Sequence, residues 1–249
     1  MTGSKTAAPE RAAASPAAHA PALSREAVEA RSKAGGEPAW MRRLRLEALA
    51  LYAAAPEPAP ADDLWRRTGP DAFPVAAAGQ PAPGWACAGT SPKPPRGLAA
   101  RLGRSENERG AVIIRKEGEP PFVRRDRSLA DAGVVFMDFA EAMNGAPELL
   151  RDHFATAVKP GAGRFEALHA ALWTSGVLVY VPRGKRIELP LRTVTVGARN
   201  GAAQMPHLLV VADEGASVTV VDEQLSPNGN GAAFELPVTE VIVGRAATV

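Results

Sequence analysis

Cysteine is almost absent from this chain, which has one cysteine, Cys87, among its 249 residues. A single thiol cannot form a disulfide within the chain, and such scarcity is typical of proteins from a reducing compartment. The chain also has no Cys-x-x-Cys pair, the usual signature of a metal centre built from thiolates. We therefore expect a cytoplasmic protein without structural disulfides.

Excess charge and long apolar runs are missing as well. The chain has 29 basic and 27 acidic residues, a net charge of +2, so no strong electrostatic field indicates a nucleic-acid partner. No run of about 20 apolar residues occurs, so we expect no membrane-spanning helix. Residues 1–23 are rich in Ala and Pro, and charged and proline residues interrupt them, which predicts a disordered tail rather than a signal peptide.

Motifs of the common catalytic sites are absent too. The sequence has no Gly-x-x-x-x-Gly-Lys-Ser/Thr phosphate loop, no His-Glu-x-x-His zinc motif and no Gly-x-Ser-x-Gly nucleophile elbow. Gly161-Ala162-Gly163 lacks the preceding strand and the third glycine of a dinucleotide site. We therefore predict that the chain is not an enzyme, and we assign no catalytic, cofactor-binding or metal-binding residue.

Hydrophobic residues make up 46% of the chain, enough for a buried core, and the first predicted region, residues 24–69, is helical. Ser24 is a suitable N-cap for a first helix that ends at Gly35-Gly36, and Glu37-Pro38 opens a second helix. We expect the helices before Ala55 to pack separately from the strands that follow. The charged residues of the second helix predict a solvated face, and they are Arg42, Arg43, Arg45 and Glu47.

A linker and a small α+β unit are predicted next. Residues 70–109 are rich in Pro, Gly and Ala, which indicates an irregular connection. Residues 110–164 are predicted to form three strands and a helix, namely Ala111 to Lys116, Pro121 to Arg125, Val134 to Met137 and a helix that begins at Pro147. His153, near the end of that helix, is interpreted as a helix-terminal or packing residue rather than a metal ligand.

Residues 165–249 form the region around which the chain is organised. They contain four short segments rich in Val, Leu and Thr, namely Val177 to Val181, Leu189 to Gly197, His207 to Ala212 and Ser217 to Asp222. No two-residue Asn-Gly or Asp-Gly turn joins these segments, so we expect successive strands to stack in parallel rather than to form hairpins. The predicted fold class is α+β, with an N-terminal helical region and a small α+β unit followed by the start of a parallel β-helix.

Two histidines in this region suggest a metal-site hypothesis. The ligands would be His169 and His207 together with acidic residues drawn from Asp213, Glu214, Asp222 and Glu223. However, His169 falls in a helical turn that leads into the strands, and Asp213-Glu214-Gly215 is the kind of polar turn that separates stacked strands. We interpret these residues as structural.

Three ordered stretches carry a resemblance to a known family: FEALHAALW at Phe165 to Trp173, SGVLVYVPRG at Ser175 to Gly184 and LLVVADEGASV at Leu208 to Val218. Together they resemble the core of the SufB/SufD family, whose members are scaffold proteins of iron–sulfur cluster assembly. The resemblance covers roughly residues 25–249 and includes the PELL element that begins at Pro147.

The resemblance implies a non-catalytic, SufD-like subunit that acts with a SufB-type scaffold and the SufC ATPase, without nucleic-acid or membrane partners. It implies that an iron–sulfur cluster forms transiently on the full complex, while this chain alone binds no cofactor, because such clusters are held by several thiolates. Cys87 is accordingly interpreted as incidental rather than as a sulfur acceptor or iron ligand. Family members are usually longer, so the resemblance also implies a chain truncated at its C-terminal end, without the ATPase-binding helices.

Two alternatives come from other functional classes. A β-solenoid acyltransferase would need a regular six-residue repeat and a catalytic histidine on a loop, and the sequence lacks that repeat. A ligand-binding solenoid, for example one for carbohydrate, is less favoured because the aromatic residues of the region are few and form no stripe. Either alternative would have no role in cluster assembly.

Overall fold

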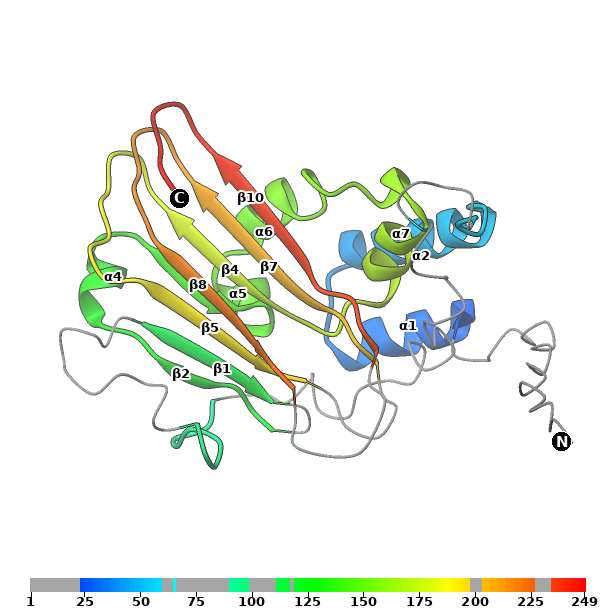
Figure 1. The fold of residues 1–249 in the computed structure, drawn as a ribbon, viewed down its shortest axis with the longest axis horizontal. Coiled ribbons are helices and arrows are strands. Elements are labelled where there is room, and N and C mark those ends of the chain that lie inside the picture. Colours follow the sequence, from blue (N-terminus) through cyan, green and yellow to red (C-terminus); the bar gives the residue numbers. More distant parts are fainter. Residues whose placement is uncertain are drawn as a thin grey trace, which may run out of the picture.

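The computed structural model describes residues 23–59, 65, 90–98, 111–116, 119–197, 203–226 and 234–249. Its strands form layers on one side of the molecule, and the helices within residues 25–54 and 164–172 gather on the other (Figure 1). The predicted tail, most of the predicted linker and Cys87 lie outside the described residues. The predicted domain boundaries remain predictions.

Two helices open the described part, α1 (Arg25–Ala34) and α2 (Ala39–Ala54). The Ser24 hydroxyl accepts a hydrogen bond from the backbone N–H of Ala27, and Gly36, with a φ of 63°, turns the chain after the helix. The predicted limits of the first helix are therefore confirmed. The later helices are α4 (Arg127–Asp131), α5 (Phe139–Gly145), α6 (Pro147–His153), the 3₁₀ helix η5 (Pro160–Ala162) and α7 (Arg164–Leu172). Within the described ranges, no helix combines the length and the apolar character that crossing a bilayer requires.

The described strands form two four-stranded sheets and one short pair. The first sheet has the order β2–β1–β5–β8, with β1 (Val112–Lys116), β2 (Phe122–Arg124), β5 (Leu191–Val196) and β8 (Val220–Leu225). The second sheet has the order β10–β7–β4–β3, with β3 (Val135–Asp138), β4 (Ser175–Val181), β7 (Pro206–Ala212) and β10 (Val238–Val243). The short pair joins β6 (Ala203–Gln204) to β9 (Phe234–Glu235).

The predicted start of a parallel β-helix is wrong, because the structure is α+β with two mixed sheets and its described residues form no closed solenoid. Strand pairs β4–β7, β7–β10 and β5–β8 are parallel, as expected from the missing hairpin turns, but β1–β2 and β3–β4 are antiparallel. Outside these two sheets, the described residues form only the β6–β9 pair and isolated bridges such as Arg186–Ser217. Pro182 and Pro190, which flank the connection from β4 to β5, have no N–H for a further ladder.

Two apolar layers hold these elements together. One cluster fills the space between the sheets, where Ile113 and Leu191 of the first sheet meet Val177 and Val210 of the second. The other covers the outer face of the second sheet and brings Met41 of α2 into the same cluster as sheet residues. The expectation that the N-terminal helices pack separately is therefore wrong, because an α2 side chain completes the core over the sheet.

Two buried arginines attach α1 and α2 to the C-terminal end of α7. Arg45 donates to the carbonyls of Ala171 and Trp173 at 2.9 and 3.1 Å, and Arg31 donates to the carbonyl of Leu172 at 3.1 Å. The last carbonyls of a helix have no partner within that helix, so these arginines cap α7. Glu37 balances the charge of Arg45 by accepting three hydrogen bonds from its guanidinium, at 3.1, 2.8 and 2.6 Å.

This arrangement corrects the prediction of a solvated charged face on the second helix. Arg42, Arg43 and Glu47 are exposed, as predicted, but Arg45 is fully buried. Its guanidinium also lies 4.0 Å from the ring centroid of Trp173, a cation–π contact. Arg45 therefore anchors the helices to the sheet layer.

Candidate functional site

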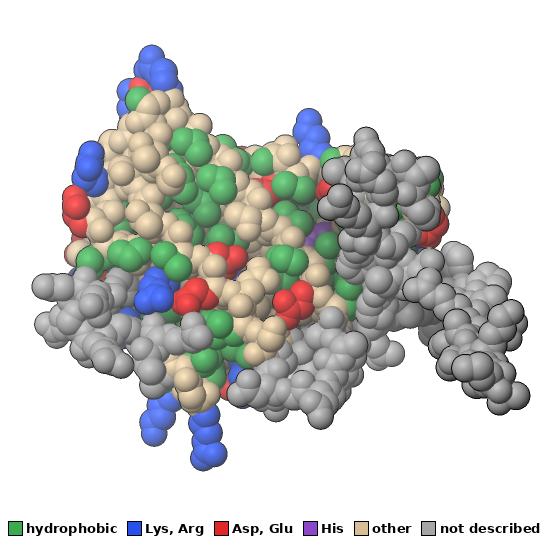
Figure 2. Space-filling model, viewed as in Figure 1, with side chains coloured by type: hydrophobic (Ala, Val, Ile, Leu, Met, Phe, Trp, Pro, Cys, Tyr) green, Lys and Arg blue, Asp and Glu red, His purple; other side chains and the backbone are tan. Residues whose placement is uncertain are grey.

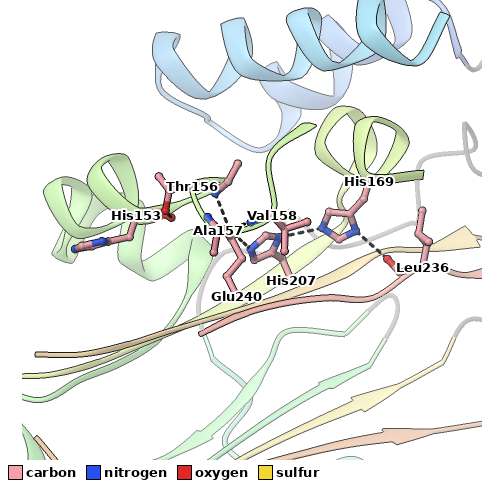
Figure 3. Close-up of polar contacts among 9 residues, drawn as sticks. His153, Thr156, Ala157, Val158, His169, His207, Leu236 and Glu240 are labelled. Atoms are coloured by element: carbon pink, nitrogen blue, oxygen red, sulfur yellow. Dashed lines mark hydrogen bonds and ion pairs between the residues drawn. The ribbon is translucent and has the colours of Figure 1, made fainter. Parts of the chain in front are cut away.

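Two buried histidines and a buried glutamate meet where α7 lies against the outer face of the second sheet (Figure 3). His169 lies in the last turn of α7, His207 in β7 and Glu240 in β10. The exposed fractions of the three residues are 2%, 2% and 1%. These residues, termed the histidine–glutamate site, form the most deeply buried cluster of titratable side chains outside the arginine cap in the part that the structure describes.

Strand alternation places the site on the helix-facing side of the sheet. Leu209 and Val211 of β7 pack into the apolar cluster beneath the helices, and His207 shares their face because it precedes Leu209 by two residues. The parallel register pairs Glu240 of β10 with Leu209, which lies two residues after His207 on β7. The Glu240 carboxylate is therefore on the same face of the sheet as the His207 ring. Two neighbouring strands thus present an imidazole and a carboxylate side by side.

Aromatic side chains cover His207. The ring of Phe154 has its centroid 4.5 Å from that of His207, and the ring of Phe139 lies at 5.7 Å. Gly176 is paired with His207 across the sheet, and a Cβ there would lie 2.3 Å from the Phe139 ring. Glycine at this position leaves room for the aromatic cover that separates the site from solvent.

Glu240 fastens the segment between α6 and η5 to the sheet. Its Oε1 accepts a hydrogen bond from the backbone N–H of Ala155 at 2.7 Å, and its Oε2 accepts from Ala157 and Val158 at 2.8 and 3.0 Å. Ala155 has a φ of 59°, an unusual value for a residue with a side chain. Burial raises the pKa of Glu240, but the hydrogen bonds from His207 and the backbone amides outweigh it and leave the pKa lowered.

Three hydrogen-bond contacts run in line through the histidine rings (Figure 3). The Nδ1 of His169 lies 2.8 Å from the carbonyl oxygen of Leu236, and its Nε2 lies 3.0 Å from the Nδ1 of His207. The Nε2 of His207 lies 2.9 Å from Oε1 of Glu240. The line therefore ends in an acceptor on both sides, a carbonyl and a carboxylate.

The number of protons in this line follows from its donors and acceptors. The Leu236 carbonyl can only accept, so the proton of His169 must be on Nδ1, which leaves its Nε2 as an acceptor for a proton on His207 Nδ1. The third contact, between His207 and Glu240, then needs one more proton. Two neutral rings supply only two protons for the three contacts, so the His207–Glu240 pair carries one in addition. Since Glu240 also accepts from three backbone amides, the carboxylate form is favoured and the proton belongs on His207.

The surroundings of the two rings act differently on their pKa values. Burial, together with the nearby charge of His207, lowers the pKa of His169 well below its ordinary value, so His169 is neutral. Burial also lowers the pKa of His207, while the hydrogen bond and charge of Glu240 act in the opposite direction. The count of ring protons favours a protonated His207 held by Glu240. Without the added proton, the contact between His207 and Glu240 would join two acceptors.

The chemistry open to this site is limited by its own hydrogen bonds. Both nitrogens of each ring already contact a carbonyl, the other ring or the carboxylate, so none is free to bind a metal ion. Among the described residues, no three His, Cys, Asp or Glu side chains converge as a metal site would require. The arrangement instead acts as a buried polar connection between α7, β7, β10 and the segment after α6.

The acidic residues proposed as partners of the histidines lie elsewhere. Asp213 and Glu214 follow β7 in an exposed turn, where Glu214 forms ion pairs with Arg183 and Arg245. Neither histidine forms a hydrogen bond or ion pair with Asp213 or Glu214. The interpretation of Asp213-Glu214-Gly215 as a polar turn is consistent with this position.

Asp222 and Glu223 lie on β8 in the first sheet, away from the site. Glu223 pairs with Arg192 at 2.9 Å, and burial raises the pKa of Asp222 while the charge of Arg115 opposes that shift. The ring of His153 lies apart from the histidine–glutamate site (Figure 3). Of the candidate ligands, the structure therefore brings together only His169 and His207.

Sequence reasoning missed Glu240. The available signal was a single carboxylate within the strand-like run Val238 to Val243, where the other residues are Val, Ile and Thr. Glu240 is also the only fully buried residue of β10. A lone acid on a strand face is costly to bury without a partner, and that cost would have indicated a buried histidine or amide cluster near it.

The chain is similar to known proteins along most of its length. Residues 122–193 match the family model described as SufBD protein N-terminal region. An iron–sulfur cluster assembly SufBD family protein of Staphylococcus epidermidis is 29% identical over 222 residues, which covers 88% of this chain and 47% of the relative. Proteins of the same description from Staphylococcus haemolyticus and Staphylococcus aureus are 29% and 28% identical, each over 91% of this chain and 49% of the relative.

The matches extend well beyond the region of the family model. They cover most of this chain, and the chain spans about half the length of the curated relatives it matches. The family model ends within β5, after the stretches Phe165 to Trp173 and Ser175 to Gly184 that carried the resemblance in the sequence. These findings agree with the resemblance seen in the sequence: over most of its length the chain is similar to proteins of the SufBD family.

Proposed function

We propose that this protein is a non-catalytic, SufD-like scaffold subunit in iron–sulfur cluster assembly. The observation that carries the proposal is its similarity, over about nine tenths of its length, to relatives whose names state that role. The protein works in the cytoplasm with a SufB-type scaffold and a SufC-type ATPase. The cluster forms transiently on the complex and is its product, not a resident cofactor of this chain.

The histidine–glutamate site supports a scaffold role over a catalytic one. Its ring nitrogens are all engaged, and its three side chains are almost fully buried, so a substrate has no access to them. The one cysteine of the chain argues in the same direction, because clusters are usually held by several thiolates. Thiolate ligands for a cluster therefore come from the partner scaffold.

The outer edge of β10 supports a protein partner. Among the described residues, no strand pairs with that edge, and the sheet order places β10 at one end. Val241 and Val243 are 44% and 49% exposed, and hydrophobic side chains lie along this face of the molecule (Figure 2). A strand edge with apolar side chains favours pairing with a further strand, which a partner chain can supply.

Size-exclusion chromatography with light scattering tests the proposal. The chain is run alone, with a SufB-type partner, and with both that partner and a SufC-type ATPase. We expect a complex with the partner, weakened in the variant Val241→Lys/Val243→Lys, because lysine on an edge strand opposes strand addition. The matched control is Leu189→Lys, an exposed apolar residue outside β10. A stable monomer that ignores the partner would contradict the scaffold assignment.

A further inference from the structure

A pocket of about 800 Å³ lies beside the histidine–glutamate site, at the opposite end of α7 from its arginine cap. Four segments distant in the sequence line it: the end of α2 with residues 55–58, Trp65, residues 160–166, and residues 234–236. Its size lies within the range usual for sites that hold small ligands. Nothing in the function proposed above uses it.

An aromatic pair forms one wall of the pocket. The rings of Trp65 and Phe165 are stacked, with centroids 5.0 Å apart and planes 28° from parallel. Leu51 and Phe234 add apolar surface to the lining. An aromatic face of this kind accepts either an apolar group or a cation, because the faces of aromatic rings are electron-rich.

The single basic residue of the lining is already engaged. Arg164 donates through Nη1 to the carbonyls of Tyr52 and Ala55 at 2.9 and 2.7 Å, and through Nη2 to the Glu57 carboxylate at 2.5 Å. Its guanidinium also lies 4.2 Å from the centroid of the Tyr52 ring. With both ends of its guanidinium committed to the α2 terminus, Arg164 neutralises Glu57 and offers little to an anionic ligand.

Two other carboxylates of the lining, Glu166 and Glu235, form no hydrogen bond or ion pair with any described residue. Gly163 holds Glu166 close to the chain, since a Cβ at that position would lie 2.4 Å from Glu166 Oε2. Glu235 is partly buried, and burial raises its pKa without an opposing positive charge. The charge of the lining is therefore negative, and it is next to an aromatic wall.

We propose that this pocket binds an organic cation, a small ligand with an ammonium or guanidinium group on an apolar stem. The stem packs on Trp65 and Phe165, and the cationic group lies between the carboxylates of Glu166 and Glu235. Such a ligand supplies the positive charge and hydrogen-bond donors that these carboxylates lack. It also gains a cation–π contribution from the tryptophan ring.

Isothermal titration of the full chain with butylguanidinium tests the proposal, with butylurea as a neutral probe of similar shape. We expect saturable binding of butylguanidinium with a dissociation constant on the order of 1 mM and binding of butylurea at least about tenfold weaker. The variant Glu166→Gln/Glu235→Gln should weaken butylguanidinium binding about tenfold or more. Acidification should weaken it as well, beginning above the ordinary pKa range of glutamate because burial raises the pKa of Glu235.

The control is Glu188→Gln, which makes the same kind of substitution once, at an exposed position outside the pocket lining. This control should bind butylguanidinium as the unaltered chain does, and circular dichroism should show all variants folded. Equal affinity for butylguanidinium and butylurea would overturn the proposal, as would an equal loss in the control or the absence of saturable binding. Since the titration uses no partner protein, its outcome is independent of the scaffold assignment.

Discussion

Three side chains of the histidine–glutamate site determine where one buried proton lies. The donor count assigns two protons to His207 and one to His169, on Nδ1. Nitrogen-15 NMR of the histidine rings at neutral pH measures this directly, because protonated and unprotonated ring nitrogens differ strongly in chemical shift. We expect His207 to be an imidazolium that becomes neutral in the variant Glu240→Gln. We expect His169 to be neutral, with its proton on Nδ1. Two neutral rings in the unaltered chain would show the donor count to be wrong.

The lowered pKa of a single residue, His169, makes the stability of the fold depend on pH. His169 is neutral in the folded chain and takes up a proton on unfolding once the pH falls below the ordinary value of 6.5. The unfolded state then binds more protons, so the free energy of unfolding decreases on acidification, by up to about 1.4 kcal/mol per pH unit for this one group. The decrease continues until the pH reaches the lowered pKa of the folded state.

Urea denaturation between about pH 7.5 and 5.5 measures this slope, a window that starts above the ordinary histidine pKa. The variant His169→Asn should be less stable at pH 7.5 but should lose less stability on acidification than the unaltered chain. His153→Asn is the matched control and should keep the full slope, since His153 lies at the partly exposed end of α6, apart from the histidine–glutamate site. Identical slopes in the unaltered chain and His169→Asn would exclude His169 as the cause.

At the scale of elements, the arginine cap is the main link between the N-terminal helices and α7. Replacing Arg45 by methionine keeps much of the side-chain volume but leaves Glu37 as an unpaired buried charge and the carbonyls of Ala171 and Trp173 without their donor. Removal of one partner from a buried ion pair costs about 3–5 kcal/mol. We expect a loss of that size in the free energy of unfolding, measured by urea denaturation.

A matched control for Arg45→Met comes from another arginine of α2. Arg43→Met makes the same substitution on the exposed side of α2, and it should change stability by less than about 0.5 kcal/mol. The double variant Glu37→Gln/Arg45→Met should recover part of the loss, because no charge is then left buried alone. Equal effects of Arg45→Met and Arg43→Met would contradict the role of Arg45 as a cap.

The sequence identified most elements but not the contacts between distant ones. Ser24 and Gly35-Gly36 limit the first helix by local chemistry, and that prediction was correct. The burial of Arg45 depends on carbonyls 126 and 128 residues away, which no local pattern of α2 reveals. In the same way His207 and Glu240 meet only through the register of β7 and β10.

At the scale of the whole molecule, the parallel pairing of strands was predictable and the closure of the fold was not. The missing two-residue turns correctly indicated that the segments of β4, β5, β7 and β8 would not form hairpins with one another. Whether parallel strands close into a solenoid depends on pairings between residues far apart in the sequence, and outside the two sheets the described residues form only a short pair and isolated bridges. The antiparallel strands β2 and β3 come from residues 119–138, which we assigned to a separate unit.

The similarity to SufBD family proteins was also predictable, because the stretch from Phe165 to Val218 keeps motifs that are recognisable in the sequence. The buried site and the aromatic pocket were not, since each combines residues from several elements. His169 and His207 were singled out as metal candidates, yet the missing partner was Glu240 and the resulting line of hydrogen bonds has no room for a metal ion.

The most direct test of the scaffold assignment is anaerobic iron–sulfur reconstitution of the chain alone and of its complex with a SufB-type scaffold and a SufC-type ATPase. Iron and sulfide are counted and visible absorption is recorded. We predict no stable cluster and no ATP hydrolysis for the chain alone, and cluster formation on the complex that falls sharply when this chain is omitted. About one cluster per isolated chain, lost on Cys87→Ser, or full cluster formation by the partners without this chain, would contradict the account.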